Sequence, residues 1–213
     1  MTKGKHRRRY LCMALCLTAA LLASALLGRV WPSPVAKDPA LTPEELKSAE
    51  IPDWIESALI RVDGASRRGV ELEAFRAIVV HYVGNPGTTA QQNHDWYANP
   101  ESEVSSHFLI GLEGEIIQCI PLNEFSSATN HRNKDTISVE VCHPDDSGRF
   151  NDAAYSSLIR LTVWLLENTG LKSNDVIRHY DVTGKECPRY YVRNEDSWHL
   201  FLQDVDAALR KEG

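Results

Sequence analysis

The stretch Ala77-Ile-Val-Val-His-Tyr82 decides the fold of this 213-residue chain. A short apolar run without polar alternation is typical of a strand that is buried on both faces of a sheet. The turn-rich sequence Gly84-Asn-Pro-Gly87 follows it and ends the strand. We therefore place the start of the folded core at Ala77, with His81 near the end of its first strand.

The segments downstream of this strand alternate between strand and helix patterns. Glu113-Gly114 is a two-residue hairpin signal between two apolar segments. In the last strand pattern Ile137, Val139 and Val141 face one way, whereas Glu140 faces the other way with its polar neighbours. The predicted elements are a helix over 90–97, strands over 108–112 and 115–120, and a strand over 137–142.

Two further helices are predicted towards the C-terminus. Asn151 caps the first one, apolar residues recur in it at helical spacing, and Gly170 ends it. The second carries an apolar stripe from Trp198 to Leu209. Both stripes are typical of core packing. The order of elements predicts an α/β fold with a mixed central β-sheet flanked by helices and a cleft on the sheet.

The N-terminal region is predicted to direct the rest of the chain out of the cytoplasm. A basic head precedes an apolar run over residues 10–27, and Ala23-Ser-Ala25 offers a cleavage site. Residues 1–28 are thus either a secretory signal peptide or a membrane anchor, and the sequence leaves both open. We expect an extracytoplasmic protein, secreted or anchored through residues 10–27. Residues 29–42 form a proline-containing linker, residues 43–76 an arm with short helices, and residues 77–213 the main domain. In the arm, Thr42-Pro-Glu-Glu45 is a capping box that predicts a short helix, and a second short segment is predicted around 53–60.

Charge and cysteine content limit the classes of partner. The formal charge of −6 becomes −11 once the five cations of residues 1–28 are set aside. An acidic domain without a basic cluster argues against nucleic acid, and an anionic polymer would have to be held by local contacts in the cleft. Cys119 and Cys142 could pair, but two cysteines are no disulfide framework, and buried free thiols are favoured.

A metal site is indicated by Arg178-His-Tyr-Asp-Val-Thr-Gly-Lys-Glu-Cys-Pro188. His179 and Cys187 lie close together there, and His81 lies 98 residues before His179. Two imidazoles and one thiolate form a three-ligand zinc site whose fourth position stays open, which is the catalytic arrangement. Each residue alone would more often be a structural histidine or a buried thiol.

Two charged residues could assist chemistry at this site. A carboxylate such as Glu140 can act as a general base for zinc-activated water, although an exposed strand glutamate is the simpler reading. Lys185 could place a cation near a developing oxyanion, although it could equally be a solvated loop lysine.

These residues stand in four ordered blocks that resemble the zinc-dependent N-acetylmuramoyl-L-alanine amidases, the group that includes phage lysozyme-type amidases and peptidoglycan recognition proteins. The resemblance runs from about Ala77 to Pro188 and comprises IVVHY, SSHFLIG, the stretch from Asn130 through TISVEVC, and RHYDVTGKECP. It implies that His81, His179 and Cys187 bind zinc, that Glu140 is the base and that Lys185 stabilises the tetrahedral intermediate.

The same resemblance implies the reaction, which is hydrolysis of the amide between the lactyl group of N-acetylmuramic acid and the first L-alanine of the peptidoglycan stem peptide. Some relatives have a catalytic tyrosine where this chain has Ser106, so the base role falls on Glu140 alone. The blocks also suggest His107 and His131 as substrate-binding residues, and a packed histidine is at least as good a reading of His107.

Two other functions remain open at this stage. The chain could be a non-catalytic peptidoglycan-recognition module, but such binders usually replace the ligand at the position of Cys187. It could be a zinc peptidase, but it lacks the His-Glu-x-x-His motif. We expect a monomer that acts on peptidoglycan or muropeptides.

Overall fold

The computed structural model describes residues 42–62 and 64–212. The predicted export segment over 1–28, and the predicted linker apart from Thr42, lie outside the described residues. Within the described ranges, no helix is both long enough and apolar enough to cross a bilayer.

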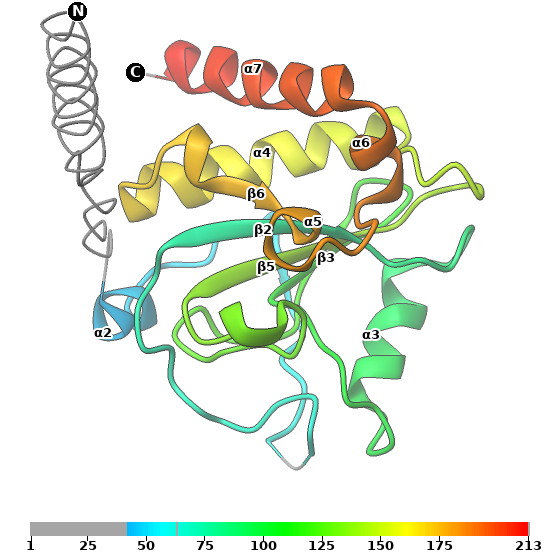
Figure 1. Cartoon of the computed structure of the whole chain (residues 1–213). Coiled ribbons are helices and arrows are strands. Elements are labelled where there is room, and N and C mark those ends of the chain that lie inside the picture. Colours follow the sequence, from blue (N-terminus) through cyan, green and yellow to red (C-terminus); the bar gives the residue numbers. More distant parts are fainter. Residues whose placement is uncertain (1–41, 63, 213) are drawn as a thin grey trace, which may run out of the picture. The chain divides into compact units, whose positions relative to one another are not determined.

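A six-stranded mixed sheet forms the centre of the fold, in the order β1-β4-β3-β5-β2-β6. Figure 1 labels β3, β5, β2 and β6 of this sheet. The β3–β4 pair is antiparallel and the other neighbouring pairs are parallel. The strands are β1 (Glu56–Ser57), β2 (Ala77–Tyr82), β3 (Phe108–Ile110), β4 (Ile116–Gln118), β5 (Thr136–Val141) and β6 (Val176–Arg178). The predicted mixed sheet and the predicted strand over 77–82 are confirmed.

The sheet register brings the chemistry-bearing residues to one edge. β5, β2 and β6 are parallel neighbours, so their carboxyl ends meet at the same edge of the sheet. His81 on β2 pairs in register with Glu140 on β5. His179 follows directly after β6. This edge is the place where parallel α/β sheets bind ligands.

Two long helices cover one face of the sheet. They are α4 (Asp152–Thr169) and α7 (Glu195–Glu212), which lie side by side in Figure 1. The Asn151 side chain caps α4 at Ala154 N, and Gly170 ends it in a left-handed conformation. The core on this face includes Ile137, Val139 and Val141, as the alternation predicted.

The opposite face of the sheet carries a smaller apolar cluster and the polar residues of β5. Helix α3 (Ala90–Ala98) packs here and begins with a capping box between Thr89 and Gln92. Its Tyr97 is buried in this cluster. Since Glu140 alternates with the residues that face α4, it also points to this side.

The N-terminal arm wraps the domain, and one of its predicted elements is wrong. Helix α2 (Pro43–Lys47) begins with the expected capping box at Thr42. A second short helix around 53–60 is not formed. Glu56 and Ser57 instead form β1, which pairs with β4 at the sheet edge, while Ile55 and Ile60 are buried. Pairing with a strand some 60 residues away leaves no local signal.

The remaining elements are short and connect the sheet to the helices. They are the 3-10 turns η1 (Asn130–Arg132) and η2 (Ser173–Asp175), and the helices α5 (His179–Thr183) and α6 (Arg189–Arg193). The predicted hairpin around Gly114 is present, with strands shorter than expected. Cys119 and Cys142 are buried free thiols, as favoured.

Candidate metal centre and active site

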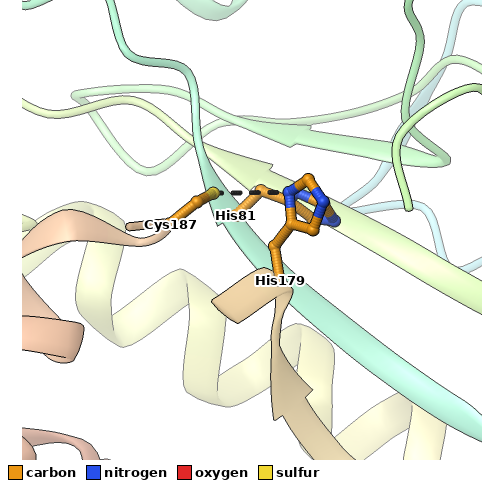
Figure 2. A group of neighbouring side chains, drawn as sticks. All are labelled: His81, His179 and Cys187. Atoms are coloured by element: carbon orange, nitrogen blue, oxygen red, sulfur yellow. Dashed lines mark hydrogen bonds between the residues drawn. The ribbon is translucent and has the colours of Figure 1, made fainter. Parts of the chain in front are cut away.

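His81, His179 and Cys187 converge on one point beside the sheet (Figure 2). One ligand atom from each side chain lies within 4.8 Å of the other two. His81 comes from the end of β2, His179 is the first residue of α5, and Cys187 lies in the loop before α6. The three sequence-predicted ligands therefore form a single cluster, and all three are buried.

The local structure after β6 explains why His179 and Cys187 meet. Arg178, at the end of β6, bonds Asp181 in the first turn of α5 and Glu195 in α7, and thereby anchors this segment. Gly184 ends α5 with φ of +75°, a left-handed conformation that glycine adopts without strain. The chain then returns, and Tyr180 N donates to Cys187 O at 2.9 Å. The reversal places the thiol beside the imidazole.

The donor set fits a zinc ion. His81 Nδ1 lies 3.8 Å from Cys187 Sγ, and His179 Nδ1 is buried without a hydrogen-bond partner. Burial holds the pKa of His81 well below its usual range, and burial lowers the pKa of His179 to about 4, so both rings are neutral and able to ligate. Burial also raises the pKa of the Cys187 thiol to about 12, so its ionisation requires a cation beside it.

Glu140 lies against this cluster. Its Oε1 is 3.8 Å from His81 Nδ1, and because that imidazole is neutral the contact is no ion pair. Its Oε2 is buried with no hydrogen-bond partner. Burial raises the pKa of Glu140 to about 8, and the charge of Lys185 opposes that shift. A carboxyl group whose pKa lies near neutrality is suited to take up and return a proton.

A cavity of about 270 Å³ opens over these residues. The three ligands, Glu140 and Lys185 all line it, so the structure brings the five main sequence-predicted site residues together. Lys185 is exposed, and its positive charge lowers the pKa values of His81, His179 and Glu140. These effects place a cation close to the reacting groups.

The two less certain histidines lie elsewhere. His107 is fully buried behind the sheet face, where Ser138 N donates to its Nδ1 and its Nε2 donates to Glu124 O. This arrangement is that of a packed histidine. His131 is exposed and lines a second cavity of about 210 Å³ together with Arg68 and Lys134. Ser127 lines both cavities, so the second one adjoins the metal centre.

Three residues at the site carry no role in the sequence-based prediction. Thr129 and Asn130 contact the two histidine ligands, and the buried Tyr97 lines the main cavity. Tyr97 belongs to α3. Its phenol therefore reaches the cavity from another element than the tyrosine that some relatives have at the position of Ser106. The periodicity of α3 marks Tyr97 only as a core residue.

Fold and site together define an α/β protein with a His-His-Cys metal centre and an adjacent carboxylate on one face of a mixed sheet. The chain belongs to the N-acetylmuramoyl-L-alanine amidase family, whose model matches residues 71–190. The cluster of His81, His179 and Cys187 is of the kind that forms the zinc site in this family.

Individual relatives agree with this membership. The chain is 28% identical over 167 residues to the N-acetylmuramoyl-L-alanine amidase CwlL of Bacillus licheniformis, covering 70% of this chain and 46% of the relative. It is 28% identical over 174 residues to the N-acetylmuramoyl-L-alanine amidase BlyA of Bacillus subtilis, covering 72% and 47%. The chain thus spans about half the length of these relatives.

Two solved structures match about 71% of this chain and nearly all of their own length. The catalytic domain of XlyA superposes with a TM-score of 0.63 at 26% identity, covering 71% of this chain and 98% of that domain. A mutant endolysin from Bacillus subtilis gives a TM-score of 0.62 at 28% identity, covering 71% and 97%. The shared fold therefore corresponds to the domain that contains the metal centre.

Proposed function

We propose that this protein is an exported zinc-dependent N-acetylmuramoyl-L-alanine amidase. The observation that carries the proposal is the convergence of His81, His179 and Cys187 with Glu140 in one cavity. The bond cleaved is the amide between the lactyl group of N-acetylmuramic acid and L-alanine of the peptidoglycan stem peptide. The similarity to CwlL and BlyA, which are named N-acetylmuramoyl-L-alanine amidases, supports this choice of bond.

The reaction requires a Lewis acid, a base and a stabilised oxyanion. His81, His179 and Cys187 would hold a zinc ion, which would supply the Lewis acid that activates water and polarises the carbonyl. Glu140 takes a proton from the attacking water, whose oxygen bonds to the lactyl carbonyl carbon. Glu140 then returns that proton to the nitrogen as the C–N bond breaks, which leaves a free carboxylate and a free amine.

Lys185 completes the charge balance of the reaction. Its ammonium group faces the same cavity as Glu140, where negative charge develops on the carbonyl oxygen. The cavity next to the centre, lined by Arg68, His131 and Lys134, supports a substrate-binding role for His131 along the stem peptide. The cations Arg68, Lys134 and Lys185 supply local contacts in an acidic domain that does not attract an anionic polymer at long range.

The bond is tested with the full-length chain, purified with zinc and incubated with muropeptides. We expect mass spectrometry to identify a free lactyl carboxylate paired with a free L-alanine amine. The matched control is Glu140→Gln, which keeps the shape of the side chain but cannot act as a base. Cleavage at another bond, or no cleavage by the zinc-loaded protein, would overturn the proposed activity.

The alternative function is recognition of peptidoglycan without cleavage. In that case the full-length chain would co-sediment with peptidoglycan and produce no new termini. All three ligands and Glu140 are present, which supports the enzyme over the binding module.

Location outside the cytoplasm is a separate part of the proposal and rests on the sequence of residues 1–28. A fusion of residues 1–42 to a reporter that is active only outside the cytoplasm tests export. Mass determination of the mature N-terminus distinguishes a cleaved signal from an anchor. An inactive reporter fusion would overturn export.

A further inference from the structure

The loop that contains Thr129 and Asn130 contacts both histidine ligands. His81 Nε2 lies 3.3 Å from Thr129 Oγ1, and His179 Nε2 lies 2.9 Å from Asn130 Oδ1. Thr129 and Asn130 are consecutive residues, while the two histidines come from different elements nearly 100 positions apart. A single short segment therefore contacts both rings at Nε2.

These contacts select the tautomer of each ring. The Asn130 amide oxygen can only accept, so His179 Nε2 carries the hydrogen and Nδ1 keeps its lone pair. The Thr129 hydroxyl can accept from His81 Nε2 in the same way. The Nδ1 atoms are then left towards the ligand cluster, where His179 Nδ1 is buried without a hydrogen-bond partner and His81 Nδ1 lies 3.8 Å from Cys187 Sγ.

The loop itself is built to hold this position. Asn130 has a φ of +56°, in the left-handed region that asparagine, aspartate and glycine tolerate better than other residues. Asn133 Oδ1 accepts from Ala128 N at 3.2 Å and from Thr129 N at 2.5 Å. Thr129 is fully buried. A residue held at positive φ beside a functional site, as Asn130 is, often has a function there.

We propose that Thr129 and Asn130 are positioning residues that fix the tautomer and orientation of both zinc-ligating imidazoles. Neither residue touches the substrate's reacting atoms in this role, because each acts through a histidine. The inference rests on the proposed zinc-dependent function. It goes beyond that function because it assigns the preorganisation of the metal centre to one loop outside the ligand set.

Variants at Asn130 separate the side chain from the backbone conformation. Asn130→Gly keeps a residue that adopts positive φ but removes the acceptor. Asn130→Asp keeps both the acceptor and the tolerance of positive φ. Thr129→Val replaces the hydroxyl with a methyl group of similar size. Asn174→Gly, at an exposed asparagine that lines neither cavity, is the matched control.

The readout is zinc affinity of the full-length chain, measured by competition with a chromogenic chelator. Loss of a hydrogen bond to a ligating histidine typically weakens metal affinity about 10- to 100-fold, so we expect that loss for Asn130→Gly and Thr129→Val. We expect the zinc affinities of Asn130→Asp and Asn174→Gly to stay within about threefold of that of the unmodified protein. Nitrogen-15 spectra of the metal-free protein should show His179 with hydrogen on Nε2, and a mixed tautomer in Asn130→Gly.

Zinc affinities of Asn130→Gly and Thr129→Val that match the unmodified protein would overturn the inference. If Asn130→Gly does not fold, Thr129→Val and the nitrogen-15 spectra of the unmodified protein decide the matter. This failure is distinct from failure of the proposed function, because zinc affinity and tautomer are measured without substrate. An unmodified chain that binds no zinc would overturn both.

Discussion

His81 and Glu140 are register partners on adjacent parallel strands, and their side chains approach to 3.8 Å between Nδ1 and Oε1. The sheet therefore places a metal ligand and the proposed general base at a fixed separation without the help of a loop. A backbone ladder is the most rigid way to hold two functional groups, because each strand is pinned by its neighbours. His179, the first residue of α5, and Cys187, in the loop before α6, complete the site around this pair.

Replacement of Glu140 by glutamine tests the base. The amide keeps the size of the side chain but cannot accept a proton, so we expect turnover to fall about 10²- to 10⁴-fold. Zinc content should remain that of the unmodified protein, because Glu140 is not a ligand in this assignment. Turnover on purified peptidoglycan and zinc content by atomic absorption are the two measurements. Near-native turnover with zinc bound would remove Glu140 from the base role.

Replacement of Cys187 by alanine tests the ligand set. We expect the unmodified chain to retain about one zinc ion after dialysis and Cys187→Ala to lose it, because two imidazoles alone do not complete a three-ligand site. The matched control is Cys119→Ala, which removes another buried thiol away from the cluster. Equal zinc content in both variants would argue against Cys187 as a ligand.

Replacement of Lys185 tests oxyanion stabilisation. Lys185→Met keeps the apolar stem and removes the charge, and loss of one such stabilising group typically lowers kcat about 10²-fold or more. We expect KM to change little, because the interaction forms in the transition state. Lys47→Met, at an exposed position on α2, serves as the control for loss of one lysine. A rise in KM with unchanged kcat would instead indicate a substrate-binding lysine.

Strong local signals made much of the fold predictable. The apolar run of β2 ends in turn residues, and α4 has a cap at Asn151 and a left-handed glycine at Gly170, so both elements appear where predicted. β1 was missed because two exposed residues form it, and its pairing with β4 depends on contacts far along the chain. Pairing of that kind is a tertiary effect, which local pattern does not report.

The candidate site likewise contains residues that the sequence predicted and residues that it did not. Residue type and the four ordered blocks pointed to the histidines, the cysteine and the glutamate, so the cluster and the carboxylate beside it were predicted. Thr129 and Asn130 act through single hydrogen bonds to residues 48 and 49 positions away. Threonine and asparagine are common in turns for local reasons, and nothing in their spacing indicates which imidazole they meet.

Replacement of Arg67 tests how the N-terminal arm is attached to the domain. Its guanidinium bonds both Glu124 carboxylate oxygens, at 2.8 and 2.7 Å, and also Ile60 O. The two side chains are only 13% and 15% exposed, so Arg67→Met leaves a mostly buried carboxylate unpaired. We expect a loss of about 3 kcal/mol in the free energy of unfolding, measured by urea denaturation.

The matched control for Arg67 is an exposed ion pair in the same protein. Lys134 and Glu73 approach to 2.7 Å, but their side chains are 57% and 66% exposed. Lys134→Met should therefore change the free energy of unfolding by less than about 1 kcal/mol. If the two variants changed the free energy of unfolding equally, the two hydrogen bonds from Arg67 to Glu124 would not anchor the arm.

His107 should make the protein less stable in mild acid. Burial lowers the pKa of His107 to about 4, whereas an unfolded histidine has a pKa of about 6.5. Between these values the unfolded chain binds the proton and the folded chain does not. The contribution of neutral His107 to the free energy of unfolding is therefore fully present above about pH 6.5 and decreases as the pH drops towards 4. By pH 5 the loss from this group is about 2 kcal/mol.

The variant His107→Gln isolates this contribution, because glutamine does not titrate and every other histidine is retained. Its own stability at pH 7.5 will be lower, since Ser138 N and Glu124 O lose well-placed partners on the ring. The informative quantity is the change in the free energy of unfolding between pH 7.5 and pH 5, from urea denaturation under the same zinc conditions. That change should be smaller in His107→Gln by about 2 kcal/mol. Equal changes in both proteins would show that His107 is protonated in the folded state at pH 5, which its two buried hydrogen bonds argue against.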